Sequence, residues 1–245
     1  GGKKPMDPEW MQGFRNETLS ICRKLGITAL GIHNDAPRLT NKPQGAILPY
    51  IRRYQPVELS HYTYPQAAKY HDVFASQFVA HCDEVAKNQA LPYKDDPMLI
   101  GYSMSDAPLL TDRAVRNRPP GATTWPRTLR NLGAEAPGKQ AYVKMLKELH
   151  KDIATFNKAY ATSFASWQSL SDAENWRPRT DYGNKIELED NAAFLKRCID
   201  QCYTVAKASL RKVDPNHMFL GDKLGARGDN FDAVIEVAAP HIDII

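Results

Sequence analysis

The segment DDPMLIGYSMSDAP, residues 95–108, places a run of apolar residues directly before Ser105 and Asp106. A short apolar run between turn-forming residues is typical of a strand that is buried on both faces, as in a parallel sheet. A carboxylate at the end of such a strand needs an explanation from its surroundings, because charged side chains are rarely buried without a partner. The segment therefore raises two questions: which fold contains the strand, and what the carboxylate does at its end.

Helix-like and strand-like segments alternate on both sides of this segment. Amphipathic spacing predicts helices, and short apolar runs predict strands. The predicted helices cover residues 7–26, 72–90, 139–161 and 191–213. The predicted strands are ITALGIH (27–33), AILPYI (46–51), MLIGYSM (98–104), MFLGDKL (218–224) and IDII (242–245). This alternation indicates an α/β fold with a parallel sheet, because parallel strands need crossover connections.

An open doubly wound sheet and a closed barrel both fit this order of elements. Two details favour a TIM-type (β/α) barrel: no glycine-rich phosphate turn follows a strand, and several strands end in polar residues. In a barrel those ends share one rim, where side chains from different strands converge. The polar residues at the predicted ends are His33, Asn34, Asp35, Arg52, Arg53, Ser105, Asp106, Asp222 and Lys223.

Composition excludes several classes of partner. The net charge of +4 comes from 32 basic and 28 acidic residues scattered among the 245, without the basic stripe that binds nucleic acid. No run approaches the roughly 18 apolar residues of a membrane span, and the first residues lack the apolar core of a signal peptide. The four cysteines are interpreted as small core residues.

Two common kinds of hydrolytic site are also disfavoured. His33, Asp35, His61 and His71 lack the spacing of H-x-H or H-E-x-x-H metal sites, and the chain has no dense acidic cluster. It also lacks the G-x-S-x-G elbow of serine hydrolases. We therefore expect neither a metal nor another cofactor.

Several of these segments, in this order, resemble agarase-like and β-galactosidase-like glycoside hydrolases of the large retaining (β/α)8-barrel clan. The most specific are the Gly101-Tyr102 strand with an acidic tip and the Asp-Pro-Asn-His turn at 214–217 before the next strand. The resemblance spans nearly the whole chain. Its segments are DVF (72–74), DDPMLIGYSMSDAP (95–108), FNKAYATSFASWQSL (156–170), DPNHMFLGDKL (214–224) and HIDII (241–245).

The resemblance implies that the five predicted strands are the second to the sixth of the barrel. The chain would then be a single catalytic-domain segment, residues 1–245, with an incomplete barrel and a long insertion at about 107–140 after the fourth strand. Two explanations stay open, namely a fragment of a longer protein and a truly incomplete barrel that self-associates or uses another chemistry.

In the family that this chain resembles, the fourth strand usually ends in Asn-Glu, and the Glu acts first as the general acid and then as the general base. Ser105 and Asp106 stand there in this chain. Asp106 is therefore the expected acid/base, although its side chain is one methylene shorter and proton transfer needs a reach of roughly 2.6–3.2 Å. The residues alone also allow Asp106 to cap the turn before Ala107 and Pro108.

A second carboxylate is needed for hydrolysis, roughly 5–5.5 Å away for retention or roughly 6.5–9.5 Å for inversion. The family carries this nucleophile on the seventh strand, so we expect it downstream of residue 245. The long segment 109–139 follows Asp106 closely and could form a lid or a wall of the substrate cleft.

Sugar binding needs paired donors and acceptors together with flat aromatic surfaces. For Trp125 we expect a surface contact with substrate, and for Trp167 a position in the core. Trp176 is a further candidate platform. The expected substrate contacts are His33, Asn34, Asp35, Arg52, Tyr102, Ser105, Trp125, Asp222 and Lys223.

The predicted function is hydrolysis of a galactose-containing polysaccharide or oligosaccharide by general acid/base catalysis. The alternative is a non-catalytic or decayed barrel that binds carbohydrate or acts as a scaffold. The expected partners are a carbohydrate and, through self-association or completion of the barrel, further polypeptide; nucleic acid and membranes are not expected. The resemblance implies a secreted or periplasmic protein.

Overall fold

The computed structural model describes residues 17, 20–22, 24–29, 48–57, 70–106, 110–116, 123–223 and 230–244. Of residues 105, 106 and 230–233 it describes the backbone alone. The predicted helix at 7–26, the predicted rim residues 33–35 and His61 therefore lie wholly or mostly outside the described residues.

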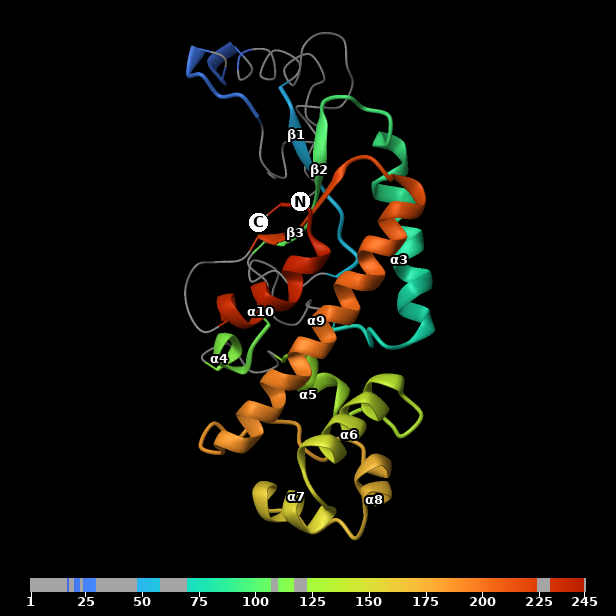
Figure 1. Cartoon of the computed structure of the whole chain (residues 1–245), viewed down its shortest axis with the longest axis vertical. Helices are drawn as coiled ribbons and strands as arrows, with labels where there is room; N and C mark the ends of the chain where they lie inside the picture. The colour runs from blue at the N-terminus through green and yellow to red at the C-terminus, as the bar shows by residue number, and fades with distance from the viewer. Residues whose placement is uncertain are drawn as a thin grey trace, which may run out of the picture.

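The described sheet has three parallel strands in the order β1-β2-β3 (Figure 1). They are β1 (Tyr50–Arg53), β2 (Leu99–Asp106) and β3 (Met218–Lys223). Because the strands are parallel, their carboxyl ends meet at one edge of the sheet. The prediction of an α/β fold with a parallel sheet is confirmed, and three of the five strand-like runs form its strands.

The register of the strands depends on one close backbone approach. Gly101 of β2 lies opposite Met218 of β3, and a Cβ atom at Gly101 would lie 2.3 Å from the Met218 carbonyl oxygen. Only glycine fits there without moving a strand. Further along, Asp106 lies opposite Lys223, so β2 and β3 end at the same level.

The other two strand-like runs are not strands in the described residues. Residues 27–29 have no regular secondary structure, and the rest of that run lies outside the described residues. Residues 242–244 are also irregular, yet the backbone N–H of Asp243 donates to Phe219 of β3 at 2.9 Å. The Asp243 carboxylate accepts from the Phe219 N–H at 2.7 Å, so this segment lies beside the start of β3.

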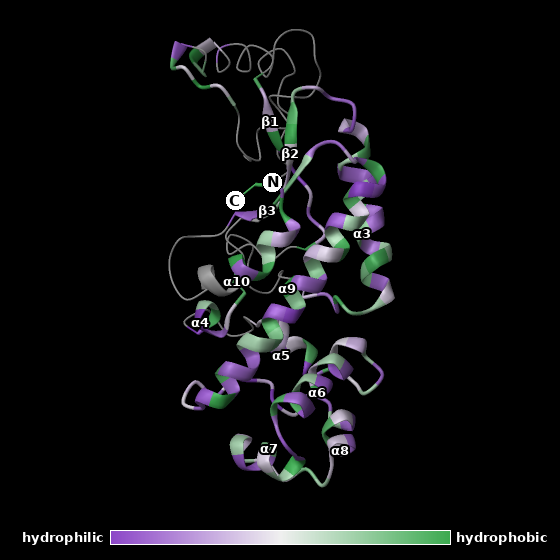
Figure 2. Ribbon diagram, in the orientation of Figure 1, coloured by the Kyte–Doolittle hydropathy of each residue, from purple (hydrophilic) through white to green (hydrophobic). Residues whose placement is uncertain are grey.

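Helices α3 (Ser76–Gln89) and α9 (Lys185–Val213) pack side by side against the sheet (Figure 1). In Figure 2, α9 alternates between hydrophilic and hydrophobic segments, as expected for a helix with one buried face. The 29 residues of α9 span about 43 Å, against about 26 Å for the eight residues of β2. The amino-terminal part of α9 therefore extends beyond the carboxyl edge of the sheet.

The interpretation of the cysteines as core residues is confirmed. All four are free and buried, and Cys82, Cys198 and Cys202 belong to the main hydrophobic core. Burial raises the pKa of the Cys82 thiol to about 12, so this thiol stays protonated at neutral pH. In the described part of the chain, no helix is long and apolar enough to cross a membrane.

The connection from β2 to β3 contains more helices than a simple crossover. These are α4 (Asp112–Val115), α5 (Trp125–Leu129), α6 (Pro137–Leu149), α7 (Ile153–Tyr160) and α8 (Trp167–Asp172), followed by α9. Helices α6, α7 and α8 form a lobe at the opposite end of the molecule from the sheet (Figure 1). The additional helices therefore continue beyond residue 140, where the predicted insertion ends. After β3 comes α10 (Asn230–Ala238), and short 3-10 turns cover Leu91–Tyr93 (η1) and Ala239–His241 (η2).

The predicted helix at 139–161 is wrong in one respect, because it is two helices. The backbone turns to an extended conformation at His150, where α6 ends. Asp152 then caps α7, since its carboxylate accepts the Thr155 N–H at 2.7 Å. A capping carboxylate at this point satisfies the free N–H groups of a new helix and favours the break.

The turn before β3 is fixed by a buried network. Asp214 accepts hydrogen bonds from the N–H groups of Asn216 and His217, and lies 2.7 Å from the His217 ring. It also accepts from the Tyr102 hydroxyl at 2.7 Å. Burial opposes ionisation of Asp214, but these hydrogen bonds outweigh it and lower the pKa of its carboxyl. The network lies at the amino edge, away from the strand tips.

Candidate functional site

The carboxyl edge of the sheet brings Asp106 and Lys223 together. The two residues are paired in register at the ends of neighbouring strands. Below them, the buried Ser103 hydroxyl donates to the Gly221 carbonyl at 3.0 Å and ties the strands together. An acidic and a basic residue thus lie at the edge where barrel enzymes carry their chemistry. The roles predicted for the Ser105 and Asp106 side chains lie outside what the structure describes.

Asp222 is held by the helix layer. The Tyr203 hydroxyl on α9 donates to its carboxylate at 2.8 Å and accepts from its backbone N–H at 3.1 Å. Burial and the adjacent carboxylate raise the pKa of Tyr203 well above its usual value, so the phenol remains a donor. Gly221 before it has φ of 66°, and a Cβ there would lie 2.9 Å from the Tyr203 ring. The glycine allows Tyr203 to approach and orient Asp222.

Arg52 is not at the rim, contrary to the prediction. Its guanidinium carbon lies 3.5 Å from the centre of the Tyr93 ring, in the turn that precedes β2. The hydroxyl of Tyr50, two residues earlier in β1, donates to Asp96 at 2.6 Å in the same connection. These two contacts show that both side chains point toward the connection between α3 and β2.

Tyr102 and Trp125 are also corrected, because both are core residues. Tyr102 is 0% exposed, and its hydroxyl bonds to the Ala90 carbonyl and to Asp214. Trp125 is 1% exposed, and its indole nitrogen donates to the His71 carbonyl at 3.0 Å. Neither ring is accessible to a sugar. Their polar atoms find partners inside the protein, which is what large amphipathic rings need when buried.

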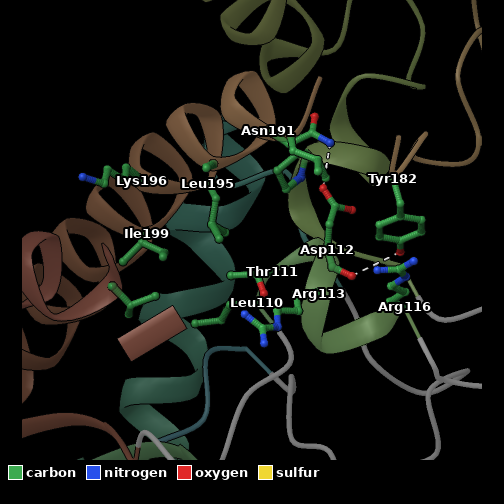
Figure 3. A pocket seen from close by; sticks show the side chains of 14 residues that line it. Leu110, Thr111, Asp112, Arg113, Arg116, Tyr182, Asn191, Leu195, Lys196 and Ile199 are labelled. Carbon is green, nitrogen blue, oxygen red and sulfur yellow. Dashed lines mark hydrogen bonds between the residues drawn. The ribbon is translucent and has the colours of Figure 1, made fainter. Parts of the chain in front are cut away.

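A cavity of about 460 Å³ lies between α4, the amino-terminal part of α9 and α10 (Figure 3). One wall is apolar and the other is polar. The apolar wall consists of Leu110, Leu188, Leu195, Ile199 and Val234. The polar wall includes Thr111, Asp112, Arg113, Arg116, Tyr182 and Asn191. Leu110–Arg113 and Arg116, which line this cavity, belong to the segment predicted to form a lid or a wall.

Asp112 is the centre of the polar wall. Its carboxylate accepts from the Thr180 hydroxyl and from the Asn191 amide, each at 2.7 Å. The Tyr182 hydroxyl donates to its backbone carbonyl at 3.1 Å, and Arg116 lies over the Tyr182 ring (Figure 3). Burial and the Asp112 charge raise the pKa of Tyr182, so the phenol stays protonated. These donors fix the carboxylate in the wall.

A buried ion pair supports this wall from behind. Arg130 donates to Glu187 at 2.9 Å and to the Asn191 side-chain oxygen at 3.2 Å. Glu187 also accepts from Arg177 at 2.6 Å, and this hydrogen bond, together with the Glu187 charge, raises the pKa of Arg177. Asn191 thus connects the ion pair to Asp112 with both ends of its amide.

The residues of this wall were missed by reasoning from the sequence. Thr180 and Asn191 lie 68 and 79 residues from Asp112, so no local spacing relates them. The local signal was Thr111-Asp112, because Thr111 caps α4 by accepting the Ala114 N–H. Such a pattern predicts a helix start and says nothing of a buried carboxylate. Among the described residues, no group of three His, Cys, Asp or Glu side chains could hold a metal ion.

Comparison with known proteins shows that the chain is similar to agarases. No protein-family model matches the chain. It is 25% identical over 179 residues to β-agarase B of Vibrio sp. (strain JT0107), covering 71% of this chain and 18% of that protein. An exo-β-agarase structure superposes with a TM-score of 0.67 at 20% identity, covering 98% of this chain and 31% of the other. The resemblance to agarase-like and β-galactosidase-like glycoside hydrolases is confirmed.

The agarase-like fold extends to a more distant protein. A β-galactosidase from the haloarchaeon Halorubrum lacusprofundi superposes with a TM-score of 0.52 at 9% identity, covering 95% of this chain and 37% of the other. At such identities the two solved structures support the fold alone. The chain spans between 18% and 37% of the length of the three proteins.

Proposed function

We propose that this chain forms the middle of a (β/α)-barrel glycoside hydrolase that acts on a galactose-containing polysaccharide or oligosaccharide. The observation that carries the proposal is the pairing of Asp106 with Lys223 at the carboxyl edge of the parallel sheet. In the proposed barrel, β1, β2 and β3 are the third, fourth and fifth strands. The agarase and β-galactosidase names of the similar proteins supply the substrate class.

Asp106 is the proposed general acid and base. Its backbone position at the end of β2 supports this role, because barrel enzymes hold catalytic residues at the carboxyl ends of their strands. The partner carboxylate belongs to a later strand of the barrel by family resemblance. The shorter reach of Asp compared with Glu is offset by a small shift of the strand end or by one bridging water.

Lys223 and Asp222 are proposed to contact sugar hydroxyls beside Asp106. Lys223 is exposed at the strand end, and Asp222 is partly exposed. An ammonium donates and a carboxylate accepts, so the two side chains offer both kinds of group to sugar hydroxyls. Tyr203 acts as a positioning residue through its hydrogen bond to Asp222. His33, Asn34, Asp35 and Ser105 stay predicted contacts.

The cavity at α4 is proposed to hold sugar units farther along the substrate. Helix α4 begins six residues after Asp106, so the cavity wall is connected closely to the proposed catalytic strand. Its apolar wall suits the C–H face of a pyranose, and its polar wall suits the hydroxyl edge. A volume of about 460 Å³ falls in the usual range for small-molecule sites.

The test is hydrolysis by the complete natural protein, because this chain spans only part of its relatives. Agarose, galactan oligosaccharides and aryl β-galactosides serve as substrates for the wild type and for Asp106→Asn and Asp106→Glu. We expect Asp106→Asn to lower turnover of natural substrates by roughly 10²- to 10⁴-fold. Aryl glycosides whose leaving group needs no proton lose far less in the first step, whereas Asp106→Glu keeps substantial activity.

Two outcomes would contradict the proposal. Full activity of Asp106→Asn, with unchanged stability, would make the carboxylate a turn cap. Binding of galactan without hydrolysis by the wild type would instead support the non-catalytic carbohydrate-binding barrel.

A further inference from the structure

A second, smaller cavity lies on the helical lobe, between α6 and α8 and far from the carboxyl edge of the sheet (Figure 1). Its volume is about 190 Å³, which is below the 300–1,000 Å³ of a typical small-molecule pocket and suits a single ring. The side chains that define its chemistry are Gln140, Lys144, Lys147, Trp167 and Gln168. We call it the lobe groove.

Trp167 is an anchored ring that still reaches the lobe groove. It is partly buried and packs against the core, with its ring centre 5.6 Å from that of Phe156. This confirms the predicted association with the core, but the indole also lines the groove. No described residue accepts a hydrogen bond from its indole nitrogen, in contrast to Trp125 and Trp176, whose nitrogens donate to backbone carbonyls.

The groove is flanked by oriented amides and by lysines. The Gln140 amide donates to the Ala134 carbonyl at 3.1 Å, and the Gln168 amide donates to Asp172 at 2.8 Å. These bonds use the NH₂ groups and leave the amide oxygens as acceptors. Lys144 and Lys147 are exposed, and neither forms an ion pair with a described residue. The groove thus offers a ring surface, two acceptors and two cationic donors.

We propose that the lobe groove binds one pyranose unit of the galactan chain as a non-catalytic site, remote from the carboxyl edge. A pyranose presents a flat C–H face that stacks on an aromatic ring and a rim of hydroxyls that both donate and accept. The lysines bind hydroxyl oxygens of a neutral galactan and the sulfate groups of a sulfated one. The choice of a galactan as the ligand rests on the proposed function, whereas the shape and chemistry of the lobe groove are observed independently of it.

Retention in native gels containing agarose or carrageenan measures this binding directly. The variants are Trp167→Ala, Trp167→Phe, and the double variant Lys144→Ala with Lys147→Ala. The control is Lys151→Ala with Lys158→Ala, which removes the same charge from exposed positions outside the groove. We expect Trp167→Ala to weaken retention about five- to tenfold, the usual value of an aromatic contact. Trp167→Phe keeps the core contact and part of the binding.

The double lysine variant distinguishes the two polysaccharides. A loss on carrageenan that shrinks at high salt identifies sulfate contacts, and an equal loss on both gels identifies hydroxyl contacts. Because both lysines are exposed, this variant tests the groove even if Trp167→Ala unfolds. Unchanged retention of both the tryptophan and the lysine variants, or no retention of the wild type on either gel, would overturn the proposal.

The same gels separate this proposal from the proposed function. Asp106→Asn should be retained like the wild type, and the groove variants should hydrolyse short soluble glycosides at the wild-type rate. Retention that depends on Trp167 in a protein without hydrolytic activity would support the groove and contradict the enzyme.

Discussion

Arg130 and Glu187 form an ion pair at 2.9 Å in which both side chains are 0% exposed. The pair joins the end of α5 to the first turn of α9, and through Asn191 it reaches Asp112 in the cavity wall. The cavity is therefore built on a buried polar network whose members are fixed by one another. Such a network holds a binding surface in shape before a ligand arrives.

Replacing Glu187 by Gln should destabilise the protein strongly. The change leaves the Arg130 charge buried without a counter-ion and also removes the partner of Arg177. Breaking a buried pair in this way costs about 3–5 kcal/mol, and urea unfolding measures the loss. The control is Glu148→Gln, because the Glu148–Arg197 pair is exposed to solvent and should contribute little. Equal effects of the two substitutions would contradict the account of the network.

Filling the cavity at Leu195 should affect long substrates selectively. Leu195 lies on the apolar wall, and Leu195→Trp would occupy space assigned to distant sugar units. We expect KM for polysaccharide to rise about tenfold while kcat/KM for a short aryl glycoside changes little. Thermal unfolding checks that the larger ring is accommodated. A proportional loss on both substrates would mean that the cavity holds no substrate or that the fold is disturbed.

Adding a methyl group at Gly101 should disrupt the sheet. The new Cβ would lie 2.3 Å from the Met218 carbonyl oxygen, so β2 and β3 would have to separate. We expect Gly101→Ala to lower the free energy of unfolding by about 1–3 kcal/mol or more. At Gly133 a Cβ meets only the flexible end of Glu174, so Gly133→Ala is the matched control and should be close to neutral.

Lys139 should give the protein a distinctive dependence on pH. Its ammonium is buried and donates to the Arg130 and Ala173 carbonyls, and burial followed by the Arg130 charge lowers its pKa to about 8. The unfolded chain keeps this proton to higher pH, so between about pH 8 and 10 it binds more protons than the folded chain. Lys139 therefore contributes a gain in stability as pH rises through this window.

The measurement compares the wild type with Lys139→Met by urea unfolding at several pH values. Buried thiols such as Cys82 contribute a slope of opposite sign, because their raised pKa favours the protonated folded state, but they do so in both proteins. The slope of stability against pH should thus be more positive in the wild type. Identical slopes would show that Lys139 titrates normally.

Much of the sheet could be predicted because strands that are buried on both faces have nearly continuous apolar sequences. The runs around residues 50, 100 and 220 became β1, β2 and β3. The direction of individual side chains could not be predicted. Arg52 follows an apolar run as a rim residue would, but its guanidinium packs over the Tyr93 ring in the turn before β2.

The burial of individual side chains could not be predicted from the sequence either. A tryptophan in a polar, Arg-rich segment suggests a surface ring, yet Trp125 enters the core because its indole nitrogen finds the His71 carbonyl 54 residues away. Asp112 is likewise buried because Thr180 and Asn191 satisfy it. Partners so distant in the sequence become visible only once the helices have packed.

The most direct test of the central claim is a crystal structure of the complete natural protein carrying Asp106→Asn, with a galactan oligosaccharide bound. The account predicts a sugar at the carboxyl edge of β2 and β3. Its glycosidic oxygen should bind the amide introduced by the substitution, either directly at a distance of at most about 3.2 Å or through one bridging water. Lys223 should contact a neighbouring hydroxyl. An oligosaccharide bound elsewhere, with no sugar near the ends of β2 and β3, would contradict it.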